Sequence, residues 1–242
     1  MSEIVRSADQ RSLARAAAER IVAVLVEAQR ARGSASLVLT GGGTGVATLT
    51  AVRDLGGDVD WSAVDVFYGD DRFLPEGDPE RNHRQTREAL LDHVDVDPAR
   101  VHVMAASDTP PGDIVAAAAA YHQTIAAFAG PSGEPTFDVH LLGMGPDSHV
   151  NSIFAGTDAV RETERLVLAV TDSPKPPPER ITLTLPAVRR SRHVFLLVSG
   201  EGKADAVAAC VGGADPIEHP AAGAVGLDST VWFLDEGSAS RL

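Results

Sequence analysis

The sequence predicts an α/β fold: a three-layer, doubly wound domain in which a mostly parallel sheet carries helices on both faces. Short apolar segments suited to buried strands alternate with segments of helical periodicity, and right-handed crossovers place such helices over each face of the sheet. Several apolar segments end in glycine-rich turns, as expected at the edge of such a sheet. With 242 residues, the chain suits one α/β domain, residues 1–242, rather than two of average size.

The predicted elements follow from the spacing of apolar residues. Residues 7–32 are predicted to form an amphipathic helix, because Leu13, Ala17 and Ile21 recur at helical spacing and Gly33 ends the pattern. Further helices are predicted at 46–55, 82–93, 113–129, 149–154 and 203–211. The predicted strands cover 36–40, 64–68, 101–104, 137–142, 166–170, 181–185, 194–198 and 231–234. Ligands of open parallel sheets bind beyond the carboxyl ends of the strands, so the turns that follow these strands contain the candidate site.

The charge of the chain limits its partners. Lysine and arginine total 21 and aspartate and glutamate 34, which gives a net charge of −13 at pH 7 and a pI near 4.9. A protein this acidic repels nucleic acid and anionic lipid, so neither a nucleic acid nor a membrane is an expected partner. An anionic ligand must therefore be captured locally. Only Lys175 and Lys203 are lysines, which makes each a residue of interest.

Cysteine, histidine and hydropathy patterns exclude further classes of protein. Cys210 is the single cysteine, so no intramolecular disulfide is expected, and its ordinary role is that of a small apolar residue on a helix. The histidines show no zinc-type spacing, and neither a metal nor an organic cofactor is expected. No apolar segment reaches the roughly 18 residues of a membrane helix, and none follows a basic start. We therefore expect a soluble, cytoplasmic protein.

Residues 41–45, Gly-Gly-Gly-Thr-Gly, follow a predicted strand and lead into a helix. Glycines let backbone N–H groups approach a phosphate, and the start of a helix adds partial positive charge. The loop lacks the Gly-Lys-Ser/Thr of a Walker loop, and Val46 breaks the dinucleotide fingerprint. We expect Gly42, Gly43 and Thr44 to bind a phosphate of the substrate, the alternative being a tight structural turn.

Asp70, Asp71 and Arg72 follow the next predicted strand. Two adjacent carboxylates beside a guanidinium have no evident packing purpose, and the forked donors of Arg72 suit a phosphate or a carboxylate. We assign Asp70 and Arg72 to the substrate site. The alternative interpretation is a solvated loop with a local ion pair.

The segment 143–149, Gly-Met-Gly-Pro-Asp-Ser-His, contains the candidate catalytic pair. His149 is predicted in the first turn of the helix at 149–154, where the macrodipole favours the neutral imidazole that acts as a base. Asp147 lies two residues earlier, where it can orient the ring and stabilise the imidazolium. In the alternative interpretation Asp147 or Ser148 is only an N-cap and His149 is a surface residue.

Two further cations complete the candidate site. Lys203 opens a predicted helix, the end at which a cation is disfavoured unless an anion lies nearby. The alternative is an exposed lysine after a loop. Arg180, which follows the proline-rich segment 173–178, is a weaker candidate, and we interpret that segment as a stiff connector.

Five motifs in one order resemble those of the 6-phosphogluconolactonases over about residues 35–235. They are Thr40-Gly-Gly-Gly-Thr44, Asp70-Asp-Arg72 with Arg81-Asn82, Gly143-Met-Gly-Pro-Asp-Ser-His149 with Ser152-Ile-Phe154, Arg180-Ile-Thr-Leu-Thr184, and Gly202-Lys-Ala204. The resemblance implies a cofactor-independent hydrolase that acts on 6-phospho-D-glucono-1,5-lactone as a monomer or small homo-oligomer.

The same resemblance assigns roles to the site residues. It makes His149 the catalytic base and Asp147 its partner, places Arg72 and Lys203 in the substrate site, and puts the glycine loop and Arg180 near the phosphate. Three positions depart from the usual family pattern, since Asp71 replaces a common Glu, Ser148 a common Gly and Ala155 a common Pro. A position that accepts Gly can require a positive φ, so Ser148 raises a question about the local backbone.

The sequence is also compatible with two alternative functions. The chain also resembles, less closely, the glucosamine-6-phosphate deaminases, which usually carry an aromatic residue at the position of Arg72. A non-catalytic sugar-phosphate sensor is the other alternative. Such a regulator predicts an attached helical DNA-binding domain, for which the segment before the first predicted strand leaves no room.

Overall fold

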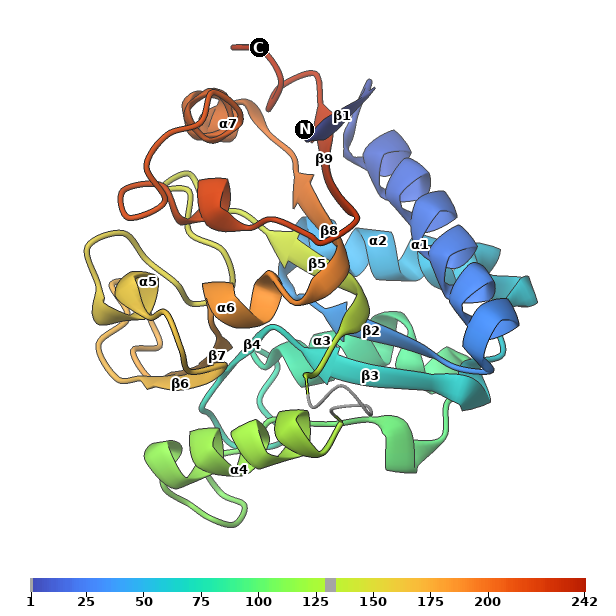
Figure 1. Ribbon diagram of the computed structural model, residues 1–242, viewed down its shortest axis with the longest axis vertical. Helices are drawn as coiled ribbons and strands as arrows, with labels where there is room; N and C mark the ends of the chain where they lie inside the picture. Colours follow the sequence, from blue (N-terminus) through green and yellow to red (C-terminus); the bar gives the residue numbers. More distant parts are fainter. Residues whose placement is uncertain (1, 129–133) are drawn as a thin grey trace.

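The main sheet has six strands, all parallel, and its topology confirms the predicted α/β class. The computed structural model describes residues 2–128 and 134–242. The strand order is β1-β9-β8-β5-β2-β3 (Figure 1). The strands are β1 (Glu3–Ser7), β2 (Ala35–Leu39), β3 (Val64–Tyr68), β5 (Phe137–Gly143), β8 (Ser191–Val198) and β9 (Ser229–Asp235).

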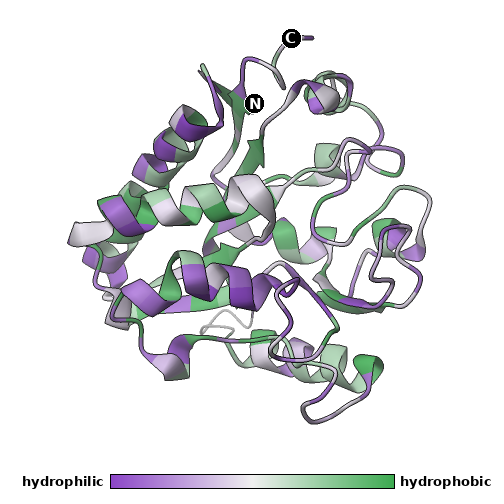
Figure 2. Ribbon diagram, turned by 180° about the vertical axis from the view of Figure 1, so that it is seen from behind, coloured by the Kyte–Doolittle hydropathy of each residue, from purple (hydrophilic) through white to green (hydrophobic). Residues whose placement is uncertain are grey.

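Helices cover both faces of this sheet. The helices are α1 (Gln10–Arg32), α2 (Gly42–Leu55), α3 (Asn82–Ala89), α4 (Ile114–Ala127), α5 (Asp158–Arg161), α6 (Leu185–Val188) and α7 (Ala204–Val211). In β8, Phe195 and Leu197 join the apolar core beneath α1 and α2, whereas Leu196 and Val198 point to the opposite core, which includes residues of α6 and α7. This alternation buries both faces of the strand. Figure 2 shows that the helices mix hydrophilic and hydrophobic residues along their lengths, as amphipathic helices do.

A second, three-stranded sheet departs from the predicted arrangement. It consists of β4 (Asp70–Arg72), β7 (Arg180–Leu183) and β6 (Val167–Val170), all antiparallel, with α4 packed against it. The segments predicted as strands at 166–170 and 181–185 therefore do not belong to the parallel sheet. The connection between them contains no helix, and adjacent strands joined without a crossover pair antiparallel.

Gly69 connects the two sheets. Its N–H donates to the carbonyl of Leu39 in β2 at 3.0 Å, and its own carbonyl accepts from the N–H of Leu183 in β7 at 2.7 Å. The chain thus leaves the parallel sheet after β3 and enters the small sheet within one residue. This turn brings Asp70 and Arg72 close to the carboxyl ends of the parallel strands.

Several predicted boundaries are wrong. Residues 3–7 form the edge strand β1, and α1 starts only at Gln10, where Asp9 caps it by accepting from the Ser12 N–H at 2.8 Å. The predicted strand at 101–104 is reduced to a single bridge between Val66 and Val101. The predicted helix at 149–154 is absent, since this described segment consists of turns and a short bridge. Residue 129, the last of the helix predicted at 113–129, lies outside the described residues.

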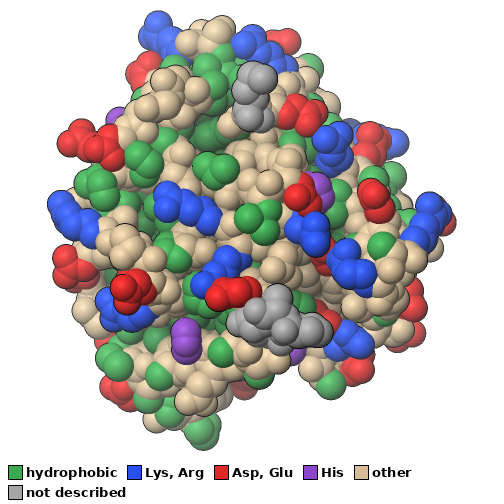
Figure 3. Space-filling view, viewed as in Figure 1, with side chains coloured by type: hydrophobic (Ala, Val, Ile, Leu, Met, Phe, Trp, Pro, Cys, Tyr) green, Lys and Arg blue, Asp and Glu red, His purple; other side chains and the backbone are tan. Residues whose placement is uncertain are grey.

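The described residues form no large patch of one charge on the face of the molecule shown in Figure 3. On the face shown in Figure 3, acidic and basic side chains are interspersed over the surface. Within residues 2–128 and 134–242, no helix combines the length and apolar character that crossing a membrane requires.

Candidate active site

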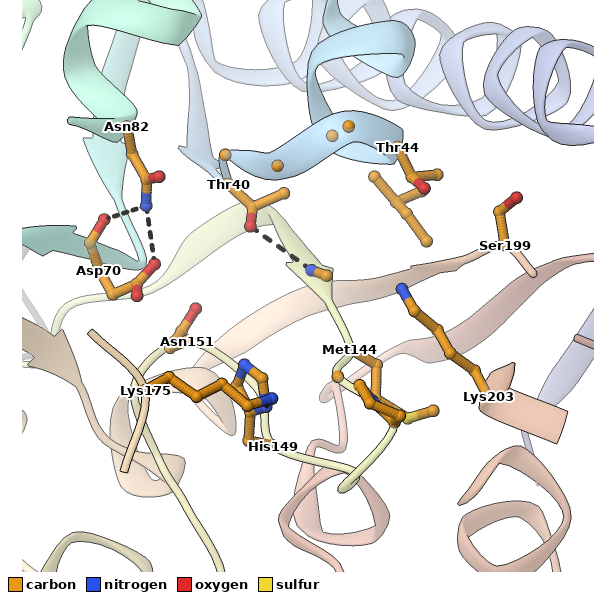
Figure 4. A pocket seen from close by; sticks show the side chains of 18 of the residues that line it. Thr40, Thr44, Asp70, Asn82, Met144, His149, Asn151, Lys175, Ser199 and Lys203 are labelled. Carbon is orange, nitrogen blue, oxygen red and sulfur yellow. Dashed lines mark hydrogen bonds between the residues drawn. The ribbon is translucent and has the colours of Figure 1, made fainter. Parts of the chain in front are cut away.

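A cavity of about 410 Å³ opens at the carboxyl ends of β2, β5 and β8, beside the small sheet. Its volume lies within the range of small-molecule sites. The cavity (Figure 4) is lined by Gln10, Thr40, Gly41, Gly42, Gly43, Thr44, Gly45, Asp70, Arg72, Asn82, Gly143, Met144, Gly145, Pro146, His149, Asn151, Lys175, Arg180, Leu197, Ser199 and Lys203. All the predicted site residues except Asp147 are among them, and Asp147 adjoins the cavity through His149.

The glycine-rich loop forms the start of α2 and has the properties of an anion site. The N-cap residue, Gly41, has no side chain that could cap this helix end, and Gly42 has a φ of 78°, in the left-handed region that favours glycine. A Cβ on Gly41 would lie 2.0 Å from Oδ1 of Asn82, so this position requires glycine. The Gly42 N–H donates to Gln85 Oε1 at 3.2 Å, whereas in the described part of the chain the N–H groups of Gly43 and Thr44 have no side-chain partner, which suits a phosphate oxygen.

Lys203 places a cation on the wall of the same cavity. The other lysine of the cavity, Lys175, pairs with Asp147, whereas in the described part of the chain the Nζ of Lys203 has neither a hydrogen bond nor an ion pair. In Figure 4, the Nζ points toward the space between Thr44 and Met144. Burial lowers the pKa of Lys203 from its usual value, although Asp235 counteracts the shift. An unpartnered ammonium group beside a helix start is suited to receive an anion.

Arg180 is fixed mainly by the proline-rich segment. Its Nε donates to the carbonyl of Pro177 at 3.1 Å, and its Nη2 donates to those of Lys175 and Pro176 at 3.0 and 3.1 Å. The segment predicted to be a stiff connector is thus held by Arg180 and carries Lys175 into the cavity. Arg180 lines the cavity as well, but most of its donors serve this loop.

His149 and Asp147 form a hydrogen-bonded pair. The Nδ1 of His149 lies 2.5 Å from Oδ1 of Asp147, and Lys175 Nζ lies 3.0 Å from the same carboxylate and 3.2 Å from Nδ1. Nδ1 cannot donate to the carboxylate and also accept from the ammonium, so we assign its proton to the shorter contact with Asp147. In this tautomer Nε2 carries the lone pair that a general base requires.

Electrostatics hold this pair in the states that base catalysis needs. Burial lowers the pKa of His149 from its usual value; Asp147 opposes this shift and Lys175 reinforces it. Partial burial would raise the pKa of Asp147, but hydrogen bonds from His149 and Lys175 outweigh it and lower that pKa to about 2. At neutral pH the imidazole is therefore neutral and Asp147 is ionised.

The position of His149 differs from the prediction, because it does not begin a helix. A sharp turn holds it instead: Ser148 has a φ of 59°, and a Cβ on Gly145 would lie 2.2 Å from the imidazole. The ring stacks on Phe154 with 4.5 Å between centroids. The neutral form is consequently favoured by burial and by Lys175 rather than by a helix macrodipole. The positive φ of Ser148 also answers the question raised by the Gly common at that position.

The acidic pair divides into two different roles. Asp70 lines the cavity, and its carboxylate accepts from Ser152 Oγ at 2.7 Å and from Asn82 Nδ2 at 2.9 Å. Asp71 points into the interior, where it pairs with Arg81 at 3.0 Å and both side chains are 1% exposed. The expectation that these carboxylates have no packing purpose is therefore wrong for Asp71.

Arg72 is held at the cavity by a short hydrogen bond. Its Nη1 donates to Oδ1 of Asn82 at 2.5 Å, and its buried Nε has no partner among residues 2–128 and 134–242. Asn82 therefore joins Arg72 to Asp70, whose carbonyl and carboxylate both accept from its amide.

Several residues in or beside the cavity received no individual role from the sequence. Lys175 was interpreted as part of a connector, although its rarity as one of two lysines was a usable signal. Phe154 lies beneath His149, with Lys175 Nζ and Arg180 Cζ each 5.9 Å from the centroid of its ring. Asn82, which belongs to one of the five motifs, and Asn151 also line the cavity, and no spacing rule assigns either of them a role. Over the described ranges, no group of three His, Cys, Asp or Glu side chains could hold a metal ion.

Comparison with known sequences identifies related enzymes. A family model described as glucosamine-6-phosphate isomerases/6-phosphogluconolactonase matches residues 8–232. The 6-phosphogluconolactonase of Mycobacterium tuberculosis is 56% identical over 236 residues, which cover 97% of this chain and 96% of that relative. The 6-phosphogluconolactonase of Streptomyces coelicolor is 53% identical over 249 residues, with 99% and 94% covered.

Solved structures share the fold. The 6-phosphogluconolactonase of Thermotoga maritima superposes with a TM-score of 0.84 at 26% identity, covering 97% of this chain and 100% of that one. The enzyme of the same name from Trypanosoma cruzi gives a TM-score of 0.84 at 27% identity, with 100% and 97% covered. A glucosamine-6-phosphate deaminase reaches a TM-score of 0.82 at 22% identity, with 99% and 100% covered, which shows a common fold alone.

Proposed function

The chain belongs to the family of glucosamine-6-phosphate isomerases and 6-phosphogluconolactonases, and we propose that it hydrolyses 6-phospho-D-glucono-1,5-lactone to 6-phospho-D-gluconate. The observation that carries the proposal is the hydrogen-bonded His149–Asp147 pair in a cavity that also contains the start of α2, whose N-cap residue is a glycine. A base and an anion site in one cavity suit a phosphorylated ester. Relatives at 56% and 53% identity named as this lactonase support the choice over the deaminase, as does Arg72.

The proposed mechanism begins with the phosphate. The first turn of α2, including Gly42, Gly43 and Thr44, binds it together with Lys203, and Arg180 contributes to the same electrostatic field. This places the lactone carbonyl carbon, C1, near Nε2 of His149. His149 takes a proton from a water molecule as that water attacks C1, while Asp147 stabilises the imidazolium.

Collapse of the tetrahedral intermediate completes hydrolysis. The bond from C1 to the ring oxygen breaks, and His149 returns the proton to that oxygen, which becomes the hydroxyl on C5. We assign stabilisation of the oxyanion to Arg72. The N–H groups of Gly143 and Gly145 are less suited, because they donate to Thr40 Oγ1 at 3.4 Å and to the His149 carbonyl at 3.1 Å.

Base assistance and positioning supply enough catalysis for this substrate class. Lactones are activated esters, and orientation of the reactants alone can lower such a barrier substantially. The mechanism therefore uses no covalent intermediate. We place the reaction in the cytoplasm, as the step of the oxidative pentose phosphate pathway that opens the lactone, because phosphorylated sugars are retained inside cells.

A direct assay tests the proposed function. Freshly generated 6-phosphogluconolactone is supplied to the purified protein, and release of 6-phosphogluconate is followed with a coupling dehydrogenase; glucosamine 6-phosphate is tested in parallel for ammonia release. We expect rapid lactone hydrolysis well above the spontaneous rate and no deamination. Deamination without lactonase activity would refute the proposal.

Lys203→Ala is expected to weaken substrate binding more than it slows the chemical step. Lys203 is an unpartnered cation of the cavity in the described part of the chain, and its proposed ligand is the phosphate rather than the reacting carbonyl. KM for the phosphorylated lactone should rise by a larger factor than kcat falls, and hydrolysis of unphosphorylated gluconolactone should change little. Equal losses on both lactones would instead assign Lys203 to the chemical step or to folding.

Exhaustive treatment with EDTA is expected to leave the activity intact. The proposed mechanism draws its base from His149 and its oxyanion stabilisation from Arg72, so it needs no bound metal. Steady-state rates are compared before and after chelation, and again after addition of Zn²⁺ or Mg²⁺. A large loss that either ion restores would overturn this part of the mechanism.

A further inference from the structure

Asn151 carries an amide whose hydrogen-bonding groups are left unused. The residue is 7% exposed, and neither its Nδ2 nor its Oδ1 has a partner anywhere in residues 2–128 and 134–242. Buried polar groups are nearly always hydrogen-bonded, so an orphaned amide requires an explanation. Asn151 lines the same cavity as His149, which suggests that a ligand provides the missing partners.

The orphaned groups are concentrated at this cavity. In the described part of the chain, four buried side-chain atoms lack a hydrogen-bond partner: Arg72 Nε, His140 Nε2, and Nδ2 and Oδ1 of Asn151. Three of the four belong to residues that line the cavity. The proposed mechanism gives Arg72 a function but does not use Asn151.

The local backbone holds the Asn151 amide at the cavity wall. Asn151 has a φ of 49°, a left-handed conformation that asparagine tolerates better than most residues. Gly69 leaves space for the amide, because a Cβ there would lie 2.4 Å from Asn151 Oδ1. The adjacent Ser152 donates to Asp70, which fixes this segment against β4. Figure 4 shows the Asn151 side chain between those of Asp70 and His149.

The chemistry of the amide selects its ligand. A carboxamide presents a donor and an acceptor side by side, whereas a phosphate offers only acceptors. The Asn151 oxygen would oppose a phosphate, but two adjacent hydroxyls match the amide, since one can donate to Oδ1 while the other accepts from Nδ2. A vicinal diol of a sugar is therefore the complementary group.

The arrangement of the cavity indicates which diol this is. In Figure 4, Thr44 and Lys203 lie on one side of His149 and Asn151 lies on the other. With the phosphate on C6 held at the first side and C1 at His149, the ring atoms farthest from the phosphate face Asn151. In a six-membered lactone C2 lies directly across the ring from C5, the atom that carries C6, and C3 is its neighbour.

We propose that Asn151 binds the hydroxyls on C2 and C3 of the lactone and makes the enzyme selective for a substrate that carries the C2 hydroxyl. This inference rests on the proposed function, because it uses the orientation in which C1 approaches His149. Asn151 is a specificity-determining residue in this arrangement, and it takes no part in proton transfer.

Two substrates and two variants test the inference. The 6-phosphogluconolactone and its 2-deoxy analogue, made by oxidation of 2-deoxyglucose 6-phosphate, are compared with wild-type protein, Asn151→Gly and Asn151→Ala. Glycine removes the amide and accepts the positive φ, whereas alanine removes the amide and strains the backbone. Thermal unfolding of each variant checks that the fold is kept.

The wild type should prefer the full lactone over the 2-deoxy analogue in kcat/KM by on the order of tenfold or more, the effect of leaving a buried polar group unpaired. In Asn151→Gly, kcat/KM for the full lactone should fall by a similar factor, whereas kcat/KM for the analogue should change little. The variant should therefore show almost no preference for the full lactone. Calorimetric titration with 6-phosphogluconate and its 2-deoxy form should show the same collapse in affinity.

Other outcomes distinguish a failure of this inference from a failure of the proposed function. If the wild type hydrolyses the lactone but the variants lower kcat/KM for both substrates by the same factor, the inference fails and the proposed function stands. The same conclusion follows if Asn151→Gly keeps the wild-type preference. If the wild type hydrolyses neither lactone, the proposed function fails and the assignment of Asn151 is overturned with it.

Discussion

Replacement of His149 by alanine is expected to lower kcat for the phosphorylated lactone by about 10² to 10⁴, the range typical of a missing general base. The imidazole is the candidate base of the cavity because its Nδ1 is bound to Asp147 and its Nε2 is left to accept a proton. Affinity for 6-phosphogluconate should be largely kept, because the phosphate is bound elsewhere. Steady-state kinetics and calorimetric titration of the product measure the two quantities.

Two further variants sharpen this result. Asp147→Asn should lose similar or less activity than His149→Ala, since it misorients the imidazole without removing it. His122→Ala provides a matched control, because His122 is exposed on α4 and does not line the cavity, and we expect wild-type kinetics. If His149→Ala kept more than about a tenth of the wild-type activity, far above the residual activity expected without a general base, the role of base would pass to Asp70. Asp71 is excluded from that role by its buried pair with Arg81.

The pH dependence of kcat/KM follows from the state of His149. Only the neutral imidazole accepts a proton, so activity falls as pH drops through its pKa. Burial, with Lys175 adding to it and Asp147 opposing it, lowers that pKa from its usual value. The acidic limb should therefore lie below about pH 6.5, the ordinary value for histidine, and should disappear in His149→Ala.

The sequence allowed most buried strands to be predicted, but not the polar strands β1 and β4. The strand β3 lies at the predicted residues 64–68, because all of its residues except Asp65 are apolar or aromatic and buried. By contrast, β1 lies at the edge of the sheet and is mostly exposed, and β4 consists of Asp70, Asp71 and Arg72. Neither shows the apolar pattern on which strand prediction depends, since β4 is held by its position after Gly69 and by pairing with β7.

The candidate site shows the same division between local and long-range information. Because ligands of open parallel sheets bind beyond the carboxyl ends of the strands, the glycine loop, Asp70 and His149 were predicted to lie at one edge of the sheet. The structure brings them into one cavity. The helix predicted at His149 failed because Ser148 and Asn151 adopt positive φ values, which apolar periodicity does not report. Lys175 was missed because the fold of the proline-rich segment, held by Arg180, determines where its side chain lies.

The buried ion pair of Asp71 and Arg81 lies next to Asn82, the residue that binds Asp70 and Arg72 at the cavity. Arg81 Nη2 also donates to the Met104 carbonyl at 2.6 Å, and Asp71 accepts from the Asn82 N–H at 2.6 Å. Asn82 in turn binds Asp70 and Arg72 through its side chain. The ion pair thus fixes the start of α3 and, through Asn82, two cavity residues. Its loss should affect stability first and the cavity second.

Arg81→Met is expected to lower the free energy of unfolding by about 3 to 5 kcal/mol at pH 7, because it leaves the Asp71 carboxylate buried without its partner. Denaturant unfolding measures this change. Arg84→Met, in the helix that Arg81 precedes, is the matched control, since the Arg84–Glu88 pair is exposed, and we expect a change within roughly 0.5 kcal/mol.

The pH dependence of the Arg81→Met loss distinguishes an uncompensated charge from a simple loss of packing. Burial raises the pKa of Asp71, and Arg81 opposes that rise, so removal of Arg81 should raise the pKa further. A carboxyl whose pKa is higher in the folded than in the unfolded state favours folding when protonated, and that advantage is lost as pH increases. The stability deficit of Arg81→Met should therefore shrink as pH falls from 8 to 5.

Asp71→Asn combined with Arg81→Met removes both charges and should recover part of the lost stability, because no buried charge is then left unpaired. A deficit that is independent of pH and persists in the double variant would mean that Arg81 stabilises the fold through packing alone.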